Sequence, residues 1–262
     1  MKHRHTYIQK VTVLIATLAI LLTKINAQEP EMVFVKGGTF TMGCTSEQLS
    51  DCYGNEQPTH LVTLSDFYIG KYPVTQKQWE QVMGTSIEVQ RDFDGPGFSL
   101  YGQGDNYPMY YVSWEDAQEF VRKLSSATGK KYRLPTEAQW EFAARGGTIS
   151  KGYRYSGSND INEVGWHDKN NNGTAHPVGL KKPNELGIYD MSGNIWEWCS
   201  DYYDDYKSDH QVDPMGPSTG LDRAMRGGNW ECALHYCRVS FRDFNPQEYR
   251  YHYLGFRVVM IP

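Results

Sequence analysis

Two cysteines near the end of the chain, Cys232 and Cys237, most constrain the local fold because they stand five positions apart. On an α-helix five residues turn the chain by about 500°, which leaves the two side chains about 140° apart. On a β-strand the same five steps span roughly 16 Å. The two sulfurs therefore meet only if this segment is a bent loop. Outside the cytosol, paired thiols in a loop close as a disulfide or bind a soft ion such as Cu(I).

The N-terminal segment predicts that the protein is exported. Three basic residues precede an apolar run over residues 11–23, and Ala27 supplies the small residue that signal peptidases require before the cleavage point. The apolar run is too short for a comfortable membrane span, and no second apolar segment follows it. We expect residues 1–27 to be a signal peptide and the mature protein to be periplasmic or secreted, with no membrane span.

Residues 28–262 read as a single domain, because they contain no Pro/Ser-rich linker, charge block or fixed-period repeat. Removal of the signal peptide takes away four basic residues and no acidic one, so the formal net charge goes from −5 to −9. An acidic exported domain is a poor candidate for nucleic-acid binding, so we expect no nucleic acid among its partners.

Composition and local patterns predict an α+β fold with little regular structure. Aromatic residues make up 14% of the chain, which also has 25 glycines and 12 prolines, and this favours large ring-lined cores joined by loops. Three short helices are expected where a hydroxyl cap stands three residues before a side chain that can return the bond. These pairs are Thr75 with Gln78, Ser113 with Asp116, and Thr136 with Gln139, and the second helix should end at Gly129. Strands are expected at residues 32–35, 38–41, 60–64 and 255–259.

Seven ordered segments carry a resemblance to a known family. They are Met32-Val-Phe-Val-Lys-Gly-Gly-Thr-Phe-Thr-Met-Gly43, Phe67-Tyr-Ile-Gly-Lys-Tyr-Pro-Val-Thr75, Val112-Ser-Trp-Glu-Asp-Ala117, residues 132–146, residues 184–198 with Gly-Asn-Ile-Trp-Glu-Trp198, Arg226-Gly-Gly228 and Leu254-Gly-Phe-Arg257. The chain resembles the sulfatase-modifying-factor family, whose type member is the formylglycine-generating enzyme. The resemblance implies a much-elaborated C-type-lectin-like α+β fold, although a fold alone does not establish chemistry.

The same resemblance implies a copper site at the paired cysteines. Cys232 and Cys237 fall on the two positions of the family's catalytic Cys-x4-Cys, and Tyr236 matches the tyrosine before the second cysteine. In the enzyme these thiolates hold Cu(I), a substrate cysteine joins as a further sulfur ligand, and O2 oxidises it to Cα-formylglycine. Thiolates are soft ligands that favour Cu(I), so the residues suit this chemistry. Many non-catalytic relatives keep only the second cysteine, which makes Cys232 the discriminating residue.

The loop also departs from the enzyme's pattern. Asn229 stands at the serine position of a Gly-Gly-Ser turn, and Ala233 and His235 replace polar residues. An amide can still donate a hydrogen bond near the copper site, but its length and shape differ from those of a hydroxyl. Two alternatives stay open from the residues: a structural disulfide between the two loop cysteines, and a zinc site that includes His235.

The other three cysteines have simpler roles. Cys44 and Cys52 lie in one polar loop and are expected to pair, whereas Cys199 is expected to be a buried free thiol. The odd total requires at least one unpaired cysteine.

A second candidate metal site lies ahead of a Trp-Glu-Trp sequence. Asp190, Gly193, Ile195 and Glu197 match a family calcium loop in which two carboxylates and two backbone carbonyls bind the ion. Oxygen ligands of this kind suit a hard cation, although the residues alone suit a solvated turn. The family's second calcium loop should lie within residues 162–172, where no ligands can be assigned.

These observations predict an exported oxidase that uses Cu(I) and O2. Its partner would be an unfolded sulfatase polypeptide with a Cys-x-Pro-x-Arg motif, and calcium would be its second cofactor. No H-E-x-x-H, G-x-S-x-G, Walker or dinucleotide motif supports another chemistry. The alternative is a non-catalytic family member that binds a protein or a glycan in the envelope.

Overall fold

The computed structural model describes residues 29–95 and 97–262. The predicted signal peptide at residues 1–27 lies outside the described residues. The α-helices of the described part are α2 (Gln76–Met83), α3 (Ile87–Asp94), α4 (Trp114–Thr128), α5 (Glu137–Ala144) and α6 (Ile161–Val164). The 3₁₀ helices are η1 (Ser46–Gln48), η2 (Gly54–Glu56), η3 (Gly147–Ile149) and η4 (Leu234–Cys237). The strands are β1 (Met32–Val35), β2 (Gly38–Met42), β3 (His60–Leu64), β4 (Phe67–Gly70), β5 (Tyr132–Arg133), β6 (Trp196–Tyr202), β7 (Gln211–Val212), β8 (Asp222–Arg226), β9 (Arg242–Pro246), β10 (Leu254–Gly255) and β11 (Val259–Met260).

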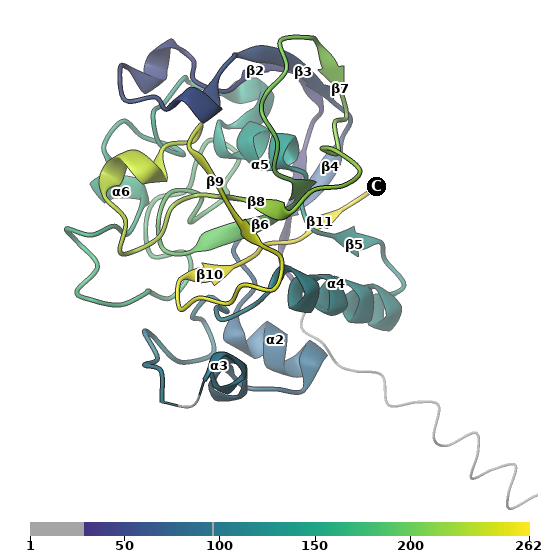
Figure 1. Cartoon of the computed structure of the whole chain (residues 1–262), viewed down its shortest axis with the longest axis vertical. Coiled ribbons are helices and arrows are strands. Elements are labelled where there is room, and N and C mark those ends of the chain that lie inside the picture. The colour runs from purple at the N-terminus through teal and green to yellow at the C-terminus, as the bar shows by residue number, and fades with distance from the viewer. Residues whose placement is uncertain (1–28, 96) are drawn as a thin grey trace, which may run out of the picture.

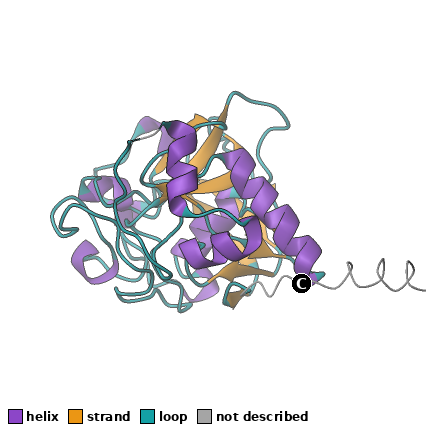
Figure 2. Cartoon of the chain, turned by 90° about the horizontal axis from the view of Figure 1, so that it is seen from below, coloured by secondary structure: helices purple, strands orange, loops and turns teal. Residues whose placement is uncertain are grey.

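These short strands form three small sheets with the orders β1-β4-β11-β5, β10-β6-β8-β9 and β2-β3-β7. The second sheet crosses the middle of the molecule, with α2, α3 and α4 gathered below it in the view of Figure 1. Helix α5 contacts β2, β6 and β8, so it packs between two of the sheets. Loops and turns form much of the molecule, as Figure 2 shows. The mixture of short helices and strands confirms the predicted α+β class with sparse regular structure.

The three predicted helix starts are confirmed. Thr75 accepts a hydrogen bond from the Gln78 backbone N–H, and the Gln78 side chain accepts one from the Thr75 N–H in return. Helices α4 and α5 begin with the same reciprocal pair of bonds. Helix α4 ends at Gly129, whose φ of 74° places it in the left-handed region that favours glycine.

The prediction of one continuous strand over residues 255–259 is wrong. The chain forms β10 and β11 instead, which belong to different sheets. Between them, Phe256 O accepts from the Val74 N–H and Val258 O accepts from the Gly70 N–H. The backbone of this segment therefore bonds to the end of β4 and to the loop after it while it crosses from one sheet to the other. Apolar alternation predicted the extended conformation but could not reveal the change of sheet.

The core combines aromatic rings with buried ion pairs. Trp79, Trp140 and Trp198 have no exposed surface, as the aromatic composition predicts. Four arginines are also fully or almost fully buried: Arg226, Arg238, Arg242 and Arg257. Each pairs with a buried glutamate, which is the condition under which a charge is tolerated in a protein interior.

None of the described helices is both long enough and apolar enough to cross a membrane. This finding does not extend to the predicted signal peptide at residues 1–27, which lies outside the described part of the chain.

Candidate functional site

The cysteine loop connects β8 to β9, two antiparallel neighbours of the central sheet. It leaves β8 through Gly227 and Gly228, which have φ values of 102° and 71°. A Cβ atom on Gly228 would lie 2.7 Å from the Cys237 sulfur, so only glycine lets the backbone pass this close to the thiol. The loop then bends through η4, and both cysteines contact the same apolar cluster.

Cys232 and Cys237 share one apolar environment and differ in exposure. Cys237 is fully buried in a small cluster with Tyr155, Ile161 and Val164, and Cys232 packs against the same cluster. Cys232 is only partly buried. Both are free thiols in the structure, so the loop is not closed by a disulfide. Cys237 therefore faces the protein interior, whereas part of residue Cys232 is exposed at the surface.

Burial controls the ionisation of both thiols. It raises the pKa of Cys232 to about 11. Hydrogen bonds from the Asn229 backbone and from the Trp196 side chain act in the opposite direction and lower this pKa. Burial also raises the pKa of Cys237 well above its usual value, and the neighbouring Cys232 raises it further. At neutral pH both side chains are protonated thiols and weak nucleophiles. Two soft sulfurs in an apolar surrounding suit Cu(I) as a donor set, and a bound cation would replace their protons.

Asn229 shapes the turn that leads to Cys232. Its side chain is buried, and its Oδ1 accepts a hydrogen bond of 2.6 Å from the Glu231 N–H, while its backbone oxygen accepts one of 3.1 Å from the Cys232 N–H. The amide that replaces the expected serine thus organises the backbone of the loop. Its oxygen is engaged within the loop.

A wall of aromatic rings stands beside the cysteines. Tyr236 stacks on Tyr53 with ring centroids 6.3 Å apart and meets Phe241 edge-on at 4.9 Å. A hydrogen bond with Tyr53 raises the pKa of Tyr236. The position of Tyr53 follows from the disulfide between Cys44 and Cys52, which directly precedes it. This pairing was predicted, but the contact of its loop with the cysteine loop was not.

The remaining cysteine and histidine predictions have clear outcomes. Cys199 is a fully buried free thiol, as predicted. His235 lies with its ring 4.1 Å from that of Tyr236. Within residues 29–95 and 97–262, no three His, Cys, Asp or Glu side chains are grouped closely enough to hold a metal. The zinc alternative at His235 therefore lacks a ligand set.

An aromatic pocket of about 590 Å³ lies near the cysteine loop. Its lining includes Phe98, Tyr101, Tyr251 and His252. The His252 ring is 3.0 Å from the carboxylate of Glu231, the residue before Cys232. The pocket therefore borders the cysteine loop at Glu231. The sequence signal for this pocket was the run of tyrosines before β10, which was assigned to the core.

The loop over residues 162–172 packs against the cysteine loop from the other side. The Asp168 N–H donates to Cys232 O at 3.0 Å, and Asn171 donates to Trp230 O. His167 lies 3.2 Å from the Asn162 side-chain oxygen. The polar side chains of this loop, where the second calcium loop was expected, bond to one another and to the cysteine loop.

The predicted calcium loop is a tight turn before β6. Asp190 and Gly193 have φ values of 58° and 79°. Asp190 is buried, and burial raises the pKa of its carboxyl to about 6. Its Oδ2 accepts from the Gly179 N–H at 2.7 Å, whereas its buried Oδ1 has no hydrogen-bond partner in the described part of the chain. An unpaired buried carboxylate oxygen is what a cation would satisfy.

Glu197 is more heavily engaged. Arg257 donates to both of its carboxylate oxygens, at 2.6 and 2.7 Å, and Trp140 donates to Oε2 at 2.7 Å. A carboxylate accepts about four hydrogen bonds, so these three leave one lone pair on Oε1 for a metal. Asp190 Oδ1 and this lone pair of Glu197 are the acceptors that the expected calcium loop would offer to the ion. The Gly193 and Ile195 carbonyls, in the same turn, would complete the ligand set.

Fold and site together define an α+β domain, poor in regular structure, that presents a two-cysteine loop next to an aromatic pocket. Residues 20–261 match the sulfatase-modifying factor enzyme 1-like domain, and the chain belongs to this family.

Several relatives of known identity are similar along most of the chain. The formylglycine-generating enzyme of Thermomonospora curvata is 31% identical, with 88% of this chain and 93% of the enzyme covered. The chaperone protein LppX of Paenibacillus barcinonensis is 34% identical, with 80% and 82% covered. The solved structure of Treponema denticola variable protein 1 superposes with a TM-score of 0.76 at 30% identity, covering 88% of this chain and 95% of that one. These likenesses confirm the predicted fold, and they show that proteins of differing function share it.

Proposed function

We propose that this protein is an exported oxidase that converts a cysteine of an unfolded sulfatase segment to Cα-formylglycine. The carrying observation is the pair of free thiols in one apolar cluster, with Cys237 buried and Cys232 partly exposed. Relatedness to formylglycine-generating enzymes supports the reaction class. The work would take place in the periplasm or outside the cell, as the N-terminal sequence predicts.

The two thiols have different roles in this proposal. Cys237 would anchor Cu(I) from the interior, and Cys232 would hold it where a substrate can approach. Bound copper would supply the activation of O2. Gly228 allows the backbone to pass close to the Cys237 sulfur, which keeps this thiol packed beneath the loop. The Asn229 turn would hold Cys232 in place through its hydrogen bond to the Cys232 N–H.

The aromatic surroundings would bind the client and exclude water. Tyr53 and Tyr236 stack beside the cysteine loop, and the pocket with Phe98 and Tyr251 borders the same loop through the contact of His252 with Glu231. An extended Cys-x-Pro-x-Arg segment would place its proline against aromatic faces. Flat rings supply a large contact area at a small loss of conformational entropy.

Copper binding is the first test. Reduced protein should bind one Cu(I), and Cys232→Ser or Cys237→Ser should abolish tight binding, since one thiolate loses the chelate advantage. The matched control is Cys199→Ser, which removes a thiol outside the loop and should bind copper like the wild type. Unchanged binding in both loop variants would remove the copper site.

The second test is product formation. The protein is loaded with copper and incubated in air with a thiol reductant and a Cys-x-Pro-x-Arg peptide, and mass spectrometry then detects the aldehyde. Conversion should be lost in Cys232→Ser and should rise about 10- to 100-fold in Asn229→Ser, because residues that support a metal site act on rates by such factors. If neither the wild type nor Asn229→Ser yields aldehyde with copper bound, the enzyme proposal is refuted.

A second function is favoured by the relatives. A chaperone and a variable protein share the fold at 34% and 30% identity, and in this chain Asn229 departs from the enzyme's serine. On this alternative the protein binds a protein or glycan in the envelope through the aromatic face. Peptide binding without conversion in the assay above would support it.

A further inference from the structure

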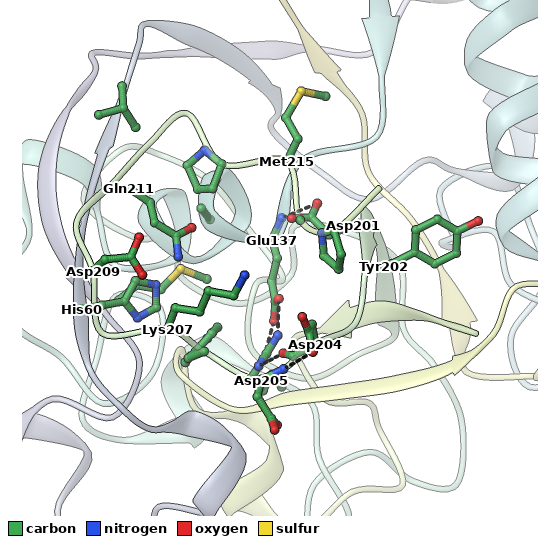
Figure 3. Close-up of a pocket in the computed structure, with 18 of the residues that line it drawn as sticks. His60, Glu137, Asp201, Tyr202, Asp204, Asp205, Lys207, Asp209, Gln211 and Met215 are labelled. Atoms are coloured by element: carbon green, nitrogen blue, oxygen red, sulfur yellow. Dashed lines mark hydrogen bonds and ion pairs between the residues drawn. The ribbon is translucent and has the colours of Figure 1, made fainter. Parts of the chain in front are cut away.

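A second pocket, of about 430 Å³, is formed by elements other than those of the cysteine loop. Its walls come from the start of α5, the end of β6, the strands β3 and β7, the loop over residues 203–210 that joins β6 to β7, and residues 214–217 after β7. Figure 3 shows these side chains arranged around a common hollow. The proposed oxidase reaction uses none of them.

The pocket carries an excess of negative charge. Glu137 is neutralised by Arg242, which donates to its two oxygens at 2.8 and 2.6 Å. This leaves four aspartates on the lining: Asp201, Asp204, Asp205 and Asp209. Besides Arg242 and two histidines, the lining has one basic residue, Lys207. The field in the pocket therefore attracts a cation and repels an anion.

Asp201 presents an unused acceptor to this pocket. The residue is 5% exposed, and both of its hydrogen bonds, from the Glu137 N–H at 3.0 Å and the Ser200 hydroxyl at 2.8 Å, go to Oδ2. No hydrogen bond to Oδ1 is formed within the described residues. Burial and the charge of Glu137 raise the pKa of Asp201 to about 7. A buried carboxylate with one idle oxygen is stabilised by a cationic donor placed against it.

The shape and walls of the pocket select the kind of cation. Apolar side chains, among them Met42, Val212 and Met215, line it beside the aspartates. The side chain of Lys207 reaches into the hollow in Figure 3, and its ammonium group forms no ion pair in the part of the chain that the structure describes. A four-carbon chain that ends in an ammonium group therefore already fits the space. Among the residues that the structure describes, no three His, Cys, Asp or Glu side chains are grouped closely enough to hold a metal, so a bare metal ion is a poorer match.

We propose that this pocket binds an alkylammonium group, the chemistry shared by a protein's lysine side chain and a free polyamine. The ammonium group lies against Asp201 Oδ1 and the aspartates at the rim, and the alkyl chain packs on the apolar walls. Lys207 occupies the same space and competes with the ligand.

The test uses the full mature protein and 1,5-diaminopentane as the probe, with binding measured by calorimetry and located by chemical-shift mapping. Asp201→Asn should weaken binding roughly tenfold or more, since it removes a charge-assisted hydrogen bond. Lys207→Ala should tighten binding by roughly threefold, because it removes a competing charge near the surface. Asp92→Asn removes an exposed carboxylate on α3 and serves as the control for net charge.

Two further comparisons make the outcome decisive. The diol 1,5-pentanediol has the same chain without the charge and should not bind. N-acetyl-lysine methylamide and spermidine then distinguish the two sources, and tighter binding of either identifies the natural ligand class. No shift of pocket residues with the diamine, or equal binding of diamine and diol, overturns the proposal. Asp209 is exposed, so Asp209→Asn should leave the fold intact. Its expected loss of affinity keeps the proposal falsifiable if Asp201→Asn disturbs the fold.

Discussion

Replacement of Asp201 by asparagine should make the protein more stable at neutral pH and leave it little changed in acid. Asparagine has the same shape, and its side-chain oxygen can still accept from the Glu137 N–H and the Ser200 hydroxyl. The variant loses only the capacity to become charged. It therefore isolates the cost of ionising one buried carboxyl.

The sign and the size of the effect follow from the raised pKa. Burial and the charge of Glu137 move the pKa of Asp201 from 3.8 to about 7. Between these values the native protein holds a proton that the unfolded chain releases, so the wild type loses stability as the pH rises through this window. About three pH units correspond to about 4 kcal/mol at pH 8, and to almost nothing at pH 4.

Urea unfolding of both proteins at intervals from pH 4 to pH 8, followed by tryptophan fluorescence, measures this difference. The raised pKa of Asp190 affects wild type and variant alike, so it cancels. The gap between the two proteins should open steadily with pH, in favour of Asp201→Asn. Asp92→Asn should not reproduce the trend. Parallel pH profiles for wild type and Asp201→Asn would show that the carboxyl is not desolvated and would refute the reasoning.

Three other changes give measurable results. If calcium binds the Asp190 turn, calcium at a hundredfold excess over its Kd should stabilise the protein by about 2.7 kcal/mol. Asp190→Asn should then erase the fall in melting temperature that a chelator causes. A wild-type melting temperature that a chelator does not change would contradict the calcium site. Glu56→Gln should cost about 3–5 kcal/mol in urea unfolding, because it strands the fully buried Arg238, and adding Arg238→Met should recover much of the loss; additive losses would count against a buried pair. Phe98→Ala, at an exposed ring of the aromatic pocket, should raise the KM for the peptide about tenfold and leave copper binding unchanged, whereas an unaltered KM would place the client elsewhere.

Local signals in the sequence were sufficient to predict the local elements. The hydroxyl caps at Thr75, Ser113 and Thr136 fix helix starts because each satisfies backbone donors within four residues. The disulfide between Cys44 and Cys52 is also local, because its two cysteines are 8 positions apart in the sequence. Helix α3 was missed, because its cap Ser86 lacks the reciprocal capping pattern and accepts no hydrogen bond from a backbone N–H of the first turn. Signals that act over a few residues can be recognised in the sequence without knowledge of the three-dimensional fold.

The buried ion pairs could not be predicted, because their partners are far apart along the chain. Arg257 meets Glu197 across 60 positions, and Arg238 meets Glu56 across 182. Each charge reads as a surface residue in isolation, since charged side chains are buried only when they are paired. The pairing depends on a three-dimensional arrangement that no periodicity encodes. The same limit hid the pocket around Asp201.

The candidate site was predictable in its residues and unpredictable in its geometry. The spacing of Cys232 and Cys237 required a bend, and the bend is present as η4. The difference in exposure between the two thiols depends on α6 and Tyr155, which lie far away in the sequence. The contact of Tyr53 with the loop depends on the disulfide that precedes it.

The buried pairs explain how a chain with so few regular elements can hold functional loops in place. Arg226 is the last residue of β8, directly before the glycines of the cysteine loop, and it pairs with Glu137 and Glu141 of α5. The backbone of Glu137 in turn holds Asp201 at the end of β6. One buried network therefore fixes the start of the cysteine loop and the base of the acidic pocket. Here buried, hydrogen-bonded ion pairs hold the loops in place, as the backbone hydrogen bonds of a longer sheet would do. Breaking one of these pairs should therefore lower the free energy of unfolding by several kcal/mol (about 3–5), whereas the loss of a surface ion pair would change it by about 1 kcal/mol or less.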